Sequence, residues 1–278
     1  MKKIKCKNLA VFYSPNNIMV AYADRRKNIF SNATFEHNNI HSVTAHENLS
    51  FNAKCHLVLD SSLYYAELVN APIEKSDRKL YKKMKWKSKQ LSPWGKDDII
   101  HDYQNIKKNN DGTTSLILSI AKREQLSRIR NYFLSAGIVL STITTIENAI
   151  LKLIEKRKNN GLTVFYYLAS DSIRLLVFND NMFVDFIILP LPDGFSTLKH
   201  LVSDSVRANA IAASWSGYLA GYKGRYGEIS AVLFCSPDND IVDFFTSNDL
   251  ADSVEFEINE TSDASSQFEY LCLKEVCC

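Results

Sequence analysis

The sequence predicts an α/β protein built from two similar halves. Three short segments rich in Val, Ile, Leu, Phe and Tyr follow one another at residues 162–190, and a comparable set lies at residues 9–35. Such residues suit a pleated, half-buried surface, so each set predicts a meander of three β-strands. After each meander, segments with helical spacing of apolar residues alternate with further strands. This alternation favours α/β units.

The second meander has the clearest turn signals. Ser170-Asp171-Ser172 and Asn179-Asp180-Asn181 separate its strands. Asn and Asp tolerate the positive φ that hairpin turns demand, and their side chains can hydrogen-bond to nearby backbone. We expect strands at Leu162–Ala169, Ile173–Phe178 and Met182–Leu189, and, in the first meander, at Leu9–Tyr13, Ile18–Ala23 and Ile29–Phe35.

The first half also carries an insert, which we place at about residues 62–112. Its helix is expected at 74–91, because Pro72 precedes the start and Ser92-Pro93 follows the end. Asp111-Gly112 predicts a tight hairpin turn. Around these features we expect strands at 55–60, 63–69, 99–106, 113–121 and 138–143, and helices at 122–136, which stops at Gly137, and at 145–157.

The polar linker Lys158-Asn159-Asn160-Gly161 is the predicted domain boundary, giving a first domain at 1–158 and a second at 159–278. A meander followed by α/β units, present twice, is typical of the actin-like (ribonuclease H-like) two-domain fold. Here the first half would carry an inserted α+β subdomain. In the second domain we expect a long helix at 195–222, strands at 229–234 and 254–258, and helices at 240–245 and 262–274.

The charge of the chain is unevenly distributed, although the net charge is only +2. From Glu228 to the end there is one lysine against twelve acidic residues, a net charge of −11, so the preceding residues carry +13. No run of about 18 apolar residues occurs, and no apolar signal-peptide core follows the basic start. We therefore expect a cytoplasmic protein with an acidic flank and a basic surface elsewhere.

Two stretches resemble one protein group. They are HLVLDSSLYYAELVNAPIEKSDRKLYKKMKWKSKQLSPW at 56–94 and AKREQLSRIRNYFLSAGIVLSTITTIENAI at 121–150. Both resemble the PilM, MshI and GspL group of actin-like proteins, through a strand, a Pro, a helix with the Trp86-Lys87 pair and a polar strand, then a helix, Ala136-Gly137, a strand and a helix. The resemblance is best over residues 55–160.

The resemblance implies a role in type IV pilus or type II secretion assembly, in a pilus cluster of the type IVb kind. Such a protein would be a non-enzymatic scaffold at the cytoplasmic face of the inner membrane. It would dock a bitopic inner-membrane assembly protein, with the pilus assembly ATPase as a further candidate partner.

Nucleotide chemistry is not predicted. Actin-like nucleotide sites use two phosphate-binding hairpins, usually Asp-x-Gly, and a Gly-Gly loop after a late strand, since glycine lets the backbone approach phosphate closely. The chain has nine glycines and no GxxxxGK[ST] motif. The departing positions are Ser14 and Asn16 in the first hairpin, Tyr167, Ala169, Ser170 and Asp171 in the second, and Ser236 and Asp238 in the late loop.

We accordingly expect no catalytic residue, cofactor or metal. The alternative is an actin-like nucleotide-binding protein, or a weak ATPase, with atypical phosphate loops.

The sharpest surface feature is the basic helix of the insert, where residues 74–89 carry eight basic and two acidic residues. Three interpretations stay open: a solvated helix face, a contact with anionic lipids or an acidic partner, and nucleic-acid binding. The near-neutral chain and its acidic flank disfavour nucleic acid. The candidate partner- or membrane-binding residues are Arg78, Lys79, Lys82, Lys83, Lys85, Trp86, Lys87 and Trp94.

Overall fold

The fold was taken from a computed structural model, which describes residues 8–15, 17–24, 29–36, 54–74, 76–96, 98–155, 161–169, 172–180, 182–191, 200–201 and 217–235. The chain divides into two compact units, and the division falls between Leu153 and Ile154. In the described part of the chain, no helix is long and apolar enough to cross a membrane.

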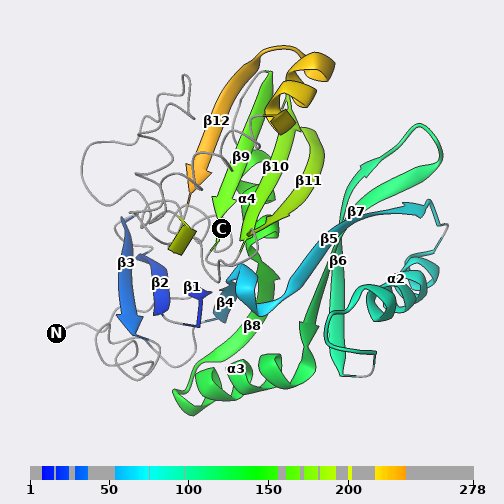
Figure 1. The fold of residues 1–278 in the computed structure, drawn as a ribbon. Helices are drawn as coiled ribbons and strands as arrows, with labels where there is room; N and C mark the ends of the chain where they lie inside the picture. The colour runs from blue at the N-terminus through cyan, green and yellow to red at the C-terminus, as the bar shows by residue number, and fades with distance from the viewer. Residues whose placement is uncertain are drawn as a thin grey trace. The chain divides into compact units, whose positions relative to one another are not determined.

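The core sheet of the first unit begins with the predicted meander. β1 (Asn8–Tyr13) pairs antiparallel with β2 (Asn17–Asp24), which pairs antiparallel with β3 (Ile29–Glu36). On its other side β1 pairs in parallel with β4 (Lys54–Leu59), and β4 pairs in parallel with β8 (Val139–Thr145). The resulting order is β3-β2-β1-β4-β8 (Figure 1).

The insert forms a separate three-stranded sheet of β5 (Tyr65–Pro72), β6 (Ile99–Lys108) and β7 (Thr113–Lys122), in the order β5-β7-β6. We call it the insert sheet. α2 (Asp77–Leu91) packs on it through Leu80 and Met84, which share a buried cluster with residues of all three strands. Because β7 belongs to this sheet, the inserted structure continues past residue 112, where the sequence prediction ended it.

Two helices frame the last strand of the core sheet. α3 (Arg123–Ser135) precedes β8, and α4 (Ile146–Glu155) follows it. Gly137 adopts a φ of 75° just after α3, and its backbone N–H donates to the carbonyl of Leu134 at 2.9 Å. The predicted glycine stop is therefore confirmed, since this left-handed conformation costs glycine little.

The second unit repeats the arrangement of the first. Its sheet contains β9 (Leu162–Leu168), β10 (Ser172–Asn179), β11 (Met182–Pro190) and β12 (Ile229–Cys235), in the order β11-β10-β9-β12. The three meander strands are antiparallel, and β12 pairs in parallel with β9, as β4 does with β1. The predicted duplication is confirmed at the level of strand order.

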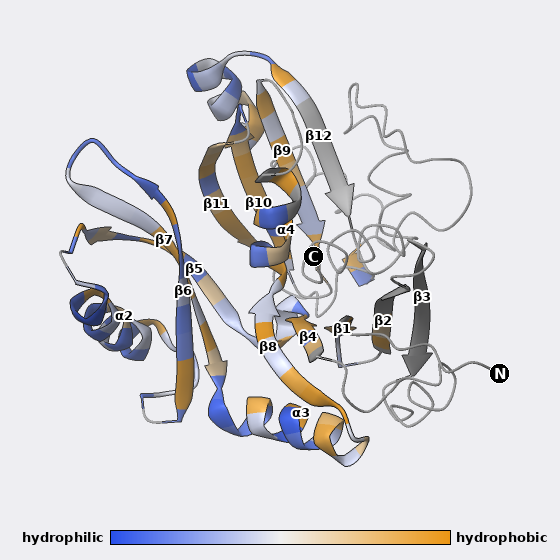
Figure 2. Ribbon diagram, turned by 180° about the vertical axis from the view of Figure 1, so that it is seen from behind, coloured by the Kyte–Doolittle hydropathy of each residue, from blue (hydrophilic) through white to orange (hydrophobic). Residues whose placement is uncertain are grey.

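β9 and β10 form the buried centre of the second sheet. Every residue of β9 is buried, and in β10 only the last is not. Figure 2 shows the apolar character of these strands. Asp180 takes a φ of 49° in the turn between β10 and β11, as its residue type predicted.

Of the long helix predicted at 195–222, residues 200–201 and 217–226 are helical. Leu201 and Tyr222 pack against one face of the sheet formed by β9 and its neighbours. The elements predicted at 240–245, 254–258 and 262–274 lie outside the described residues.

Candidate functional site

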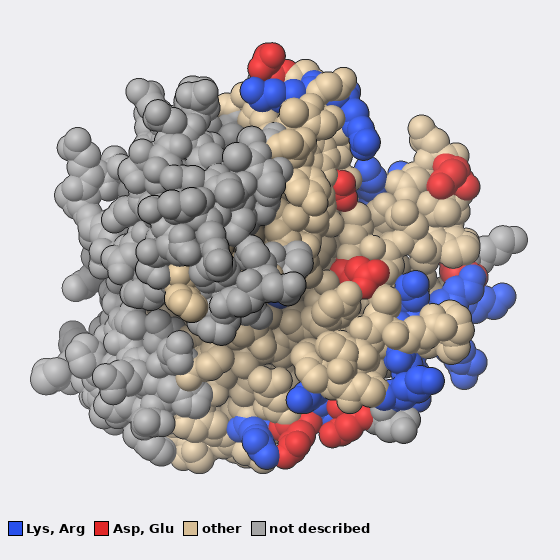
Figure 3. Space-filling view, in the orientation of Figure 1, with Lys and Arg blue, Asp and Glu red and all other residues tan. Residues whose placement is uncertain are grey.

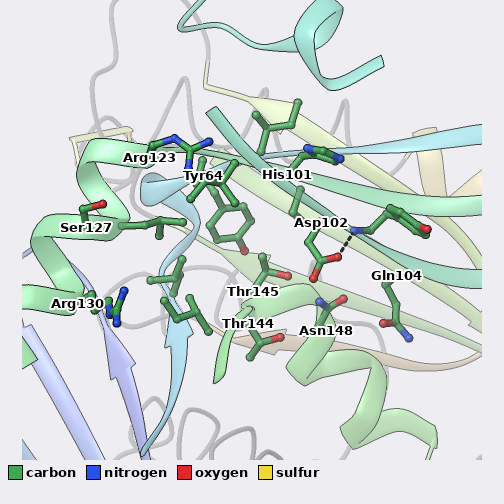
Figure 4. Close-up of a pocket in the computed structure, with 18 residues that line it drawn as sticks. Tyr64, His101, Asp102, Gln104, Arg123, Ser127, Arg130, Thr144, Thr145 and Asn148 are labelled. Carbon is green, nitrogen blue, oxygen red and sulfur yellow. Dashed lines mark hydrogen bonds between the residues drawn. The ribbon is translucent and has the colours of Figure 1, made fainter. Parts of the chain in front are cut away.

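A cavity of about 540 Å³ lies within the first unit, bordered by β6 of the insert sheet, by β8 of the core sheet and by α3 and α4 (Figure 4). We call it the β6–β8 cavity. Its lining includes Ile100, Asp102 and Gln104 from β6; Ile143, Thr144 and Thr145 from β8; Arg123, Leu126, Ser127 and Arg130 from α3; Asn148 from α4; and Tyr64.

Both strands that border the cavity are sheet edges. Among the described strands, β6 pairs with β7 alone and β8 pairs with β4 alone. An edge strand carries a row of backbone N–H and C=O groups that no neighbouring strand satisfies. The cavity is therefore bounded on two sides by backbone that can accept a further extended chain.

The apolar part of the lining comes from both edge strands. Ile100 on β6 and Ile143 on β8 expose 37% and 38% of their surface, and both line the cavity. Leu126 of α3 lines it as well. An exposed isoleucine is unremarkable alone, but two on facing strands around one hollow form a surface that gains by being covered.

The polar part of the lining contains two atoms that lack a partner. The Oγ1 of Thr145 and the Oδ1 of Asn148 are buried and make no hydrogen bond within the described structure. In Figure 4 the carboxylate of Asp102 points toward both residues. An unsatisfied buried polar atom costs about 1–3 kcal/mol. A ligand with its own donors and acceptors would remove this cost.

The floor of the cavity is held by a buried hydrogen-bond network. The hydroxyl of Tyr64 donates to Oε2 of Glu147 at 2.5 Å and accepts from the backbone N–H of Ile146 at 3.1 Å. Glu147 has no exposed surface. The short 3₁₀ turn Ser61–Leu63 that precedes Tyr64 is capped by Asp60, whose Oδ1 accepts from the backbone N–H of Ser62 at 2.9 Å. These bonds hold Tyr64 in place in the free protein.

Charges of both signs stand around the cavity. Asp102 contributes a carboxylate from β6, and its Oδ1 accepts from the backbone N–H of Tyr103 at 2.9 Å. Arg123 and Arg130 contribute cations from α3, and Arg123 also forms an ion pair with Asp98 at 3.5 Å. The lining thus combines apolar, polar and charged groups.

His101 of β6 also borders the cavity, although its ring packs against α2. Its ring centroid lies 4.9 Å from that of Tyr81 in α2, because successive strand residues point to opposite faces. Burial lowers the pKa of the His101 imidazole below its ordinary value of 6.5, and the nearby Lys85 acts in the same direction, against the opposing effect of Asp102.

The predicted basic helix is α2, which covers the face of the insert sheet opposite the cavity. Leu80, Met84 and Ser88 form its buried side, and Trp86 is 64% exposed. Trp94 is apart from this surface, since it packs against the insert core and lies under the Nζ of Lys122 at 5.6 Å. The basic residues that α2 itself contributes are Arg78, Lys79, Lys82, Lys83, Lys85, Lys87 and Lys89.

The predicted nucleotide loops are described in part. Ser14 is buried at the end of β1, and Tyr167 and Ala169 have no exposed surface at the end of β9. These three residues therefore belong to the buried part of the two sheets. Asn16, Ser170, Asp171, Ser236 and Asp238 lie outside the described residues.

Sequence reasoning did not single out Ile100, Ile143, Thr145 or Asn148 as site residues. Ile100 and Ile143 each sit in a segment that reads as an ordinary strand, and Thr145 and Asn148 stand at a strand end and a helix start. The polar character of Ile99–Lys108 was the available signal, because a central strand would carry a more apolar sequence.

No protein-family model matches the chain, and no curated protein sequence matches it either. Solved structures do. The structure described as the PilM–PilN type IV pilus biogenesis complex superposes with a TM-score of 0.72 at 9% identity, over 98% of this chain and 99% of the other.

Two further solved structures are similar at a TM-score of 0.50. One is a Bacteroides thetaiotaomicron protein of unknown function with an actin-like ATPase fold, at 10% identity over 84% of this chain and 91% of the other. The other is the cytoplasmic domain of EpsL, an inner-membrane component of the Vibrio cholerae type II secretion system, at 12% identity over 88% and 95%. At these identities the likeness shows the fold, which is the predicted actin-like two-domain fold.

Proposed function

We propose that this protein is a non-enzymatic scaffold of a type IV pilus assembly platform, and that it holds an extended segment of a bitopic inner-membrane subunit in the β6–β8 cavity. The observation that carries the proposal is the lining of this cavity. Two sheet edges, two exposed isoleucines and two unpartnered buried polar atoms converge there.

An extended peptide suits each part of this lining. Its backbone can pair with the free edge of β6 or β8, as in β-strand addition, and can supply donors and acceptors to Thr145 and Asn148. Its alternate side chains can cover Ile100 and Ile143. About a third of each isoleucine is exposed, so covering it is worth roughly 0.5–1 kcal/mol, and the backbone pairing must supply much of the affinity.

A bitopic subunit can offer such a peptide, because its cytoplasmic segment continues into its membrane span. Two similar solved structures support a membrane-protein partner. One is a complex of PilM with PilN in pilus biogenesis, and the other is the cytoplasmic domain of an inner-membrane secretion component. We place the protein at the cytoplasmic face of the inner membrane, with the assembly ATPase as a second partner.

We further propose that the pilus this protein helps to assemble is of the type IVb kind. It rests on the resemblance in overall size and character to TcpD, the cytoplasmic protein of the toxin-coregulated pilus. The two sequence stretches that resemble the PilM, MshI and GspL group run through α2, α3, β8 and α4 and include most of the cavity walls.

A nucleotide role is the competing function, since the fold is shared with an actin-like ATPase fold protein. The described loop residues argue against it. Tyr167 and Ala169 are buried at the end of β9, where a phosphate would need open backbone.

Titration calorimetry separates the two functions. The full chain is titrated in parallel with a synthetic peptide of the bitopic subunit's cytoplasmic segment and with Mg-ATP. We expect saturable heat with the peptide and none with Mg-ATP. Micromolar Mg-ATP affinity accompanied by turnover, without peptide binding, would overturn the proposal.

A further inference from the structure

We propose that the outer face of α2 binds directly to the surface of a membrane that contains anionic lipids. This basic face consists of Lys79, Lys82, Lys83 and Trp86. The proposal does not rest on the peptide-binding function, because it concerns the opposite side of the insert sheet and needs no protein partner.

The four residues form one continuous stripe. Their spacing of three, four and seven residues from Lys79 places them on one face of a helix. Leu80 and Met84 point the other way and are buried against the insert sheet. The position of Trp86 is nearly opposite the buried side, which agrees with its 64% exposure.

The charge of α2 works against the helix itself. Seven of its fifteen residues are basic, and its only acidic residue is Asp77. Like charges three or four residues apart cost an exposed helix about 0.2–0.5 kcal/mol per pair, and cations in the first turn oppose the helix dipole. Figure 3 shows the Lys and Arg side chains gathered over α2. Lys83 forms an ion pair with Glu74, just before the helix, and an anionic surface would offset the repulsion that remains.

The exposed Trp86 favours a lipid membrane over other anionic partners. A solvated face gains nothing from a tryptophan at its centre, whereas Trp, like Tyr, is enriched where water meets lipid. Lysine stems lie along apolar surface and keep their ammonium groups in water. A convex helix face that presents lysines around one indole therefore matches lipid headgroups. Generic nucleic-acid binding would instead use a basic groove with several stacking rings.

The test is co-sedimentation of the full chain with vesicles of phosphatidylethanolamine and phosphatidylglycerol. We expect binding to these vesicles, none to phosphatidylcholine vesicles, and release by high salt, since screening shortens the reach of the lysine charges. At about one kcal/mol for each lysine near an anionic surface, the variant Lys79→Glu/Lys82→Glu/Lys83→Glu should bind at least about 100-fold more weakly.

The matched control is Lys108→Glu/Lys152→Glu/Lys223→Glu, which changes the net charge equally at three exposed lysines away from α2. It should bind almost as well as the parent chain. The fluorescence of the parent should shift to the blue on vesicle binding, and the Trp86→Phe variant should lose most of that shift.

Three results would overturn the proposal. They are a failure of the parent chain to bind anionic vesicles, equal loss in the two triple variants, and binding to generic DNA with no vesicle binding. Because every substituted residue is exposed or half-exposed, circular dichroism should show all variants folded.

Discussion

The two sides of the insert sheet differ in chemistry although they belong to the same strands. On one side, Ile99 and Tyr103 of β6 pack beneath α2, which turns a cationic face outward. On the other side, Ile100 and Asp102 of the same strand face the β6–β8 cavity. Successive side chains of this edge strand point to opposite faces, so one strand contributes residues to both surfaces. Under the two proposals made above, the insert adds two binding faces to an actin-like core.

The strongest way to break this comparison is to disable each side separately. Ile100→Asp/Ile143→Asp places carboxylates where apolar side chains are covered on peptide binding, so peptide affinity should fall at least about 100-fold. Vesicle binding should not change. The triple glutamate variant of α2 should show the reverse pattern. The measurements are peptide calorimetry and vesicle co-sedimentation on both variants.

Leu134→Asp/Val139→Asp is the matched control, since these residues are 55% and 61% exposed and lie outside the cavity lining. It should retain peptide binding. If the isoleucine variant and this control lose the peptide equally, the cavity is not the site.

A smaller effect is expected from the Thr145→Val variant, which tests the role of the polar lining. Thr145→Val keeps the shape of the side chain and removes a buried hydroxyl oxygen that has no partner in the described structure. We expect the free protein to become more stable by about 1 kcal/mol, because a desolvated polar atom is lost. Peptide affinity should fall by about fivefold. Chemical denaturation and calorimetry check the two halves of the prediction.

Ser115→Ala provides the contrast. The hydroxyl of Ser115 is also buried, but it donates to Oδ1 of Asn70 at 2.8 Å. Its removal should destabilise the protein by about 1 kcal/mol. Equal effects in the two variants would show that the Thr145 hydroxyl is satisfied after all.

The smallest effect concerns His101, whose ring packs against Tyr81 of α2. Burial lowers its pKa below 6.5, so the folded state binds this proton less readily than the unfolded state. The contribution of neutral His101 to the free energy of unfolding is therefore fully present above about pH 6.5. It is lost as the pH drops through the folded pKa. His101→Gln should remove this part of the decline. Urea denaturation at about pH 7.5 and pH 5.5 measures it.

The strands, helices and duplication could be predicted because each depends on local sequence. Dense runs of apolar residues mark β1 and β2, Asn and Asp mark the turn at Asp180, and Gly137 marks the end of α3. The same local logic located α2 and its cationic face. Such features need no knowledge of which distant segments meet.

The cavity could not be predicted, because distant segments create it. Tyr64 and Glu147 are separated by 83 residues, and their hydrogen bond builds the floor. Ile100 and Ile143 look like core residues in the sequence, and only the pairing of the sheets leaves β6 and β8 as edges. The Thr145 and Asn148 side chains likewise resemble an ordinary strand end and helix start until their burial is known.

The central claim is that a bitopic subunit docks in the β6–β8 cavity, and site-specific photo-crosslinking in living cells tests it most directly. A benzophenone side chain placed at Ile143 should form an adduct with the bitopic subunit. The same group at Met182, which is 70% exposed in the second unit, should form none. An adduct from position 182 with none from position 143 would contradict the account.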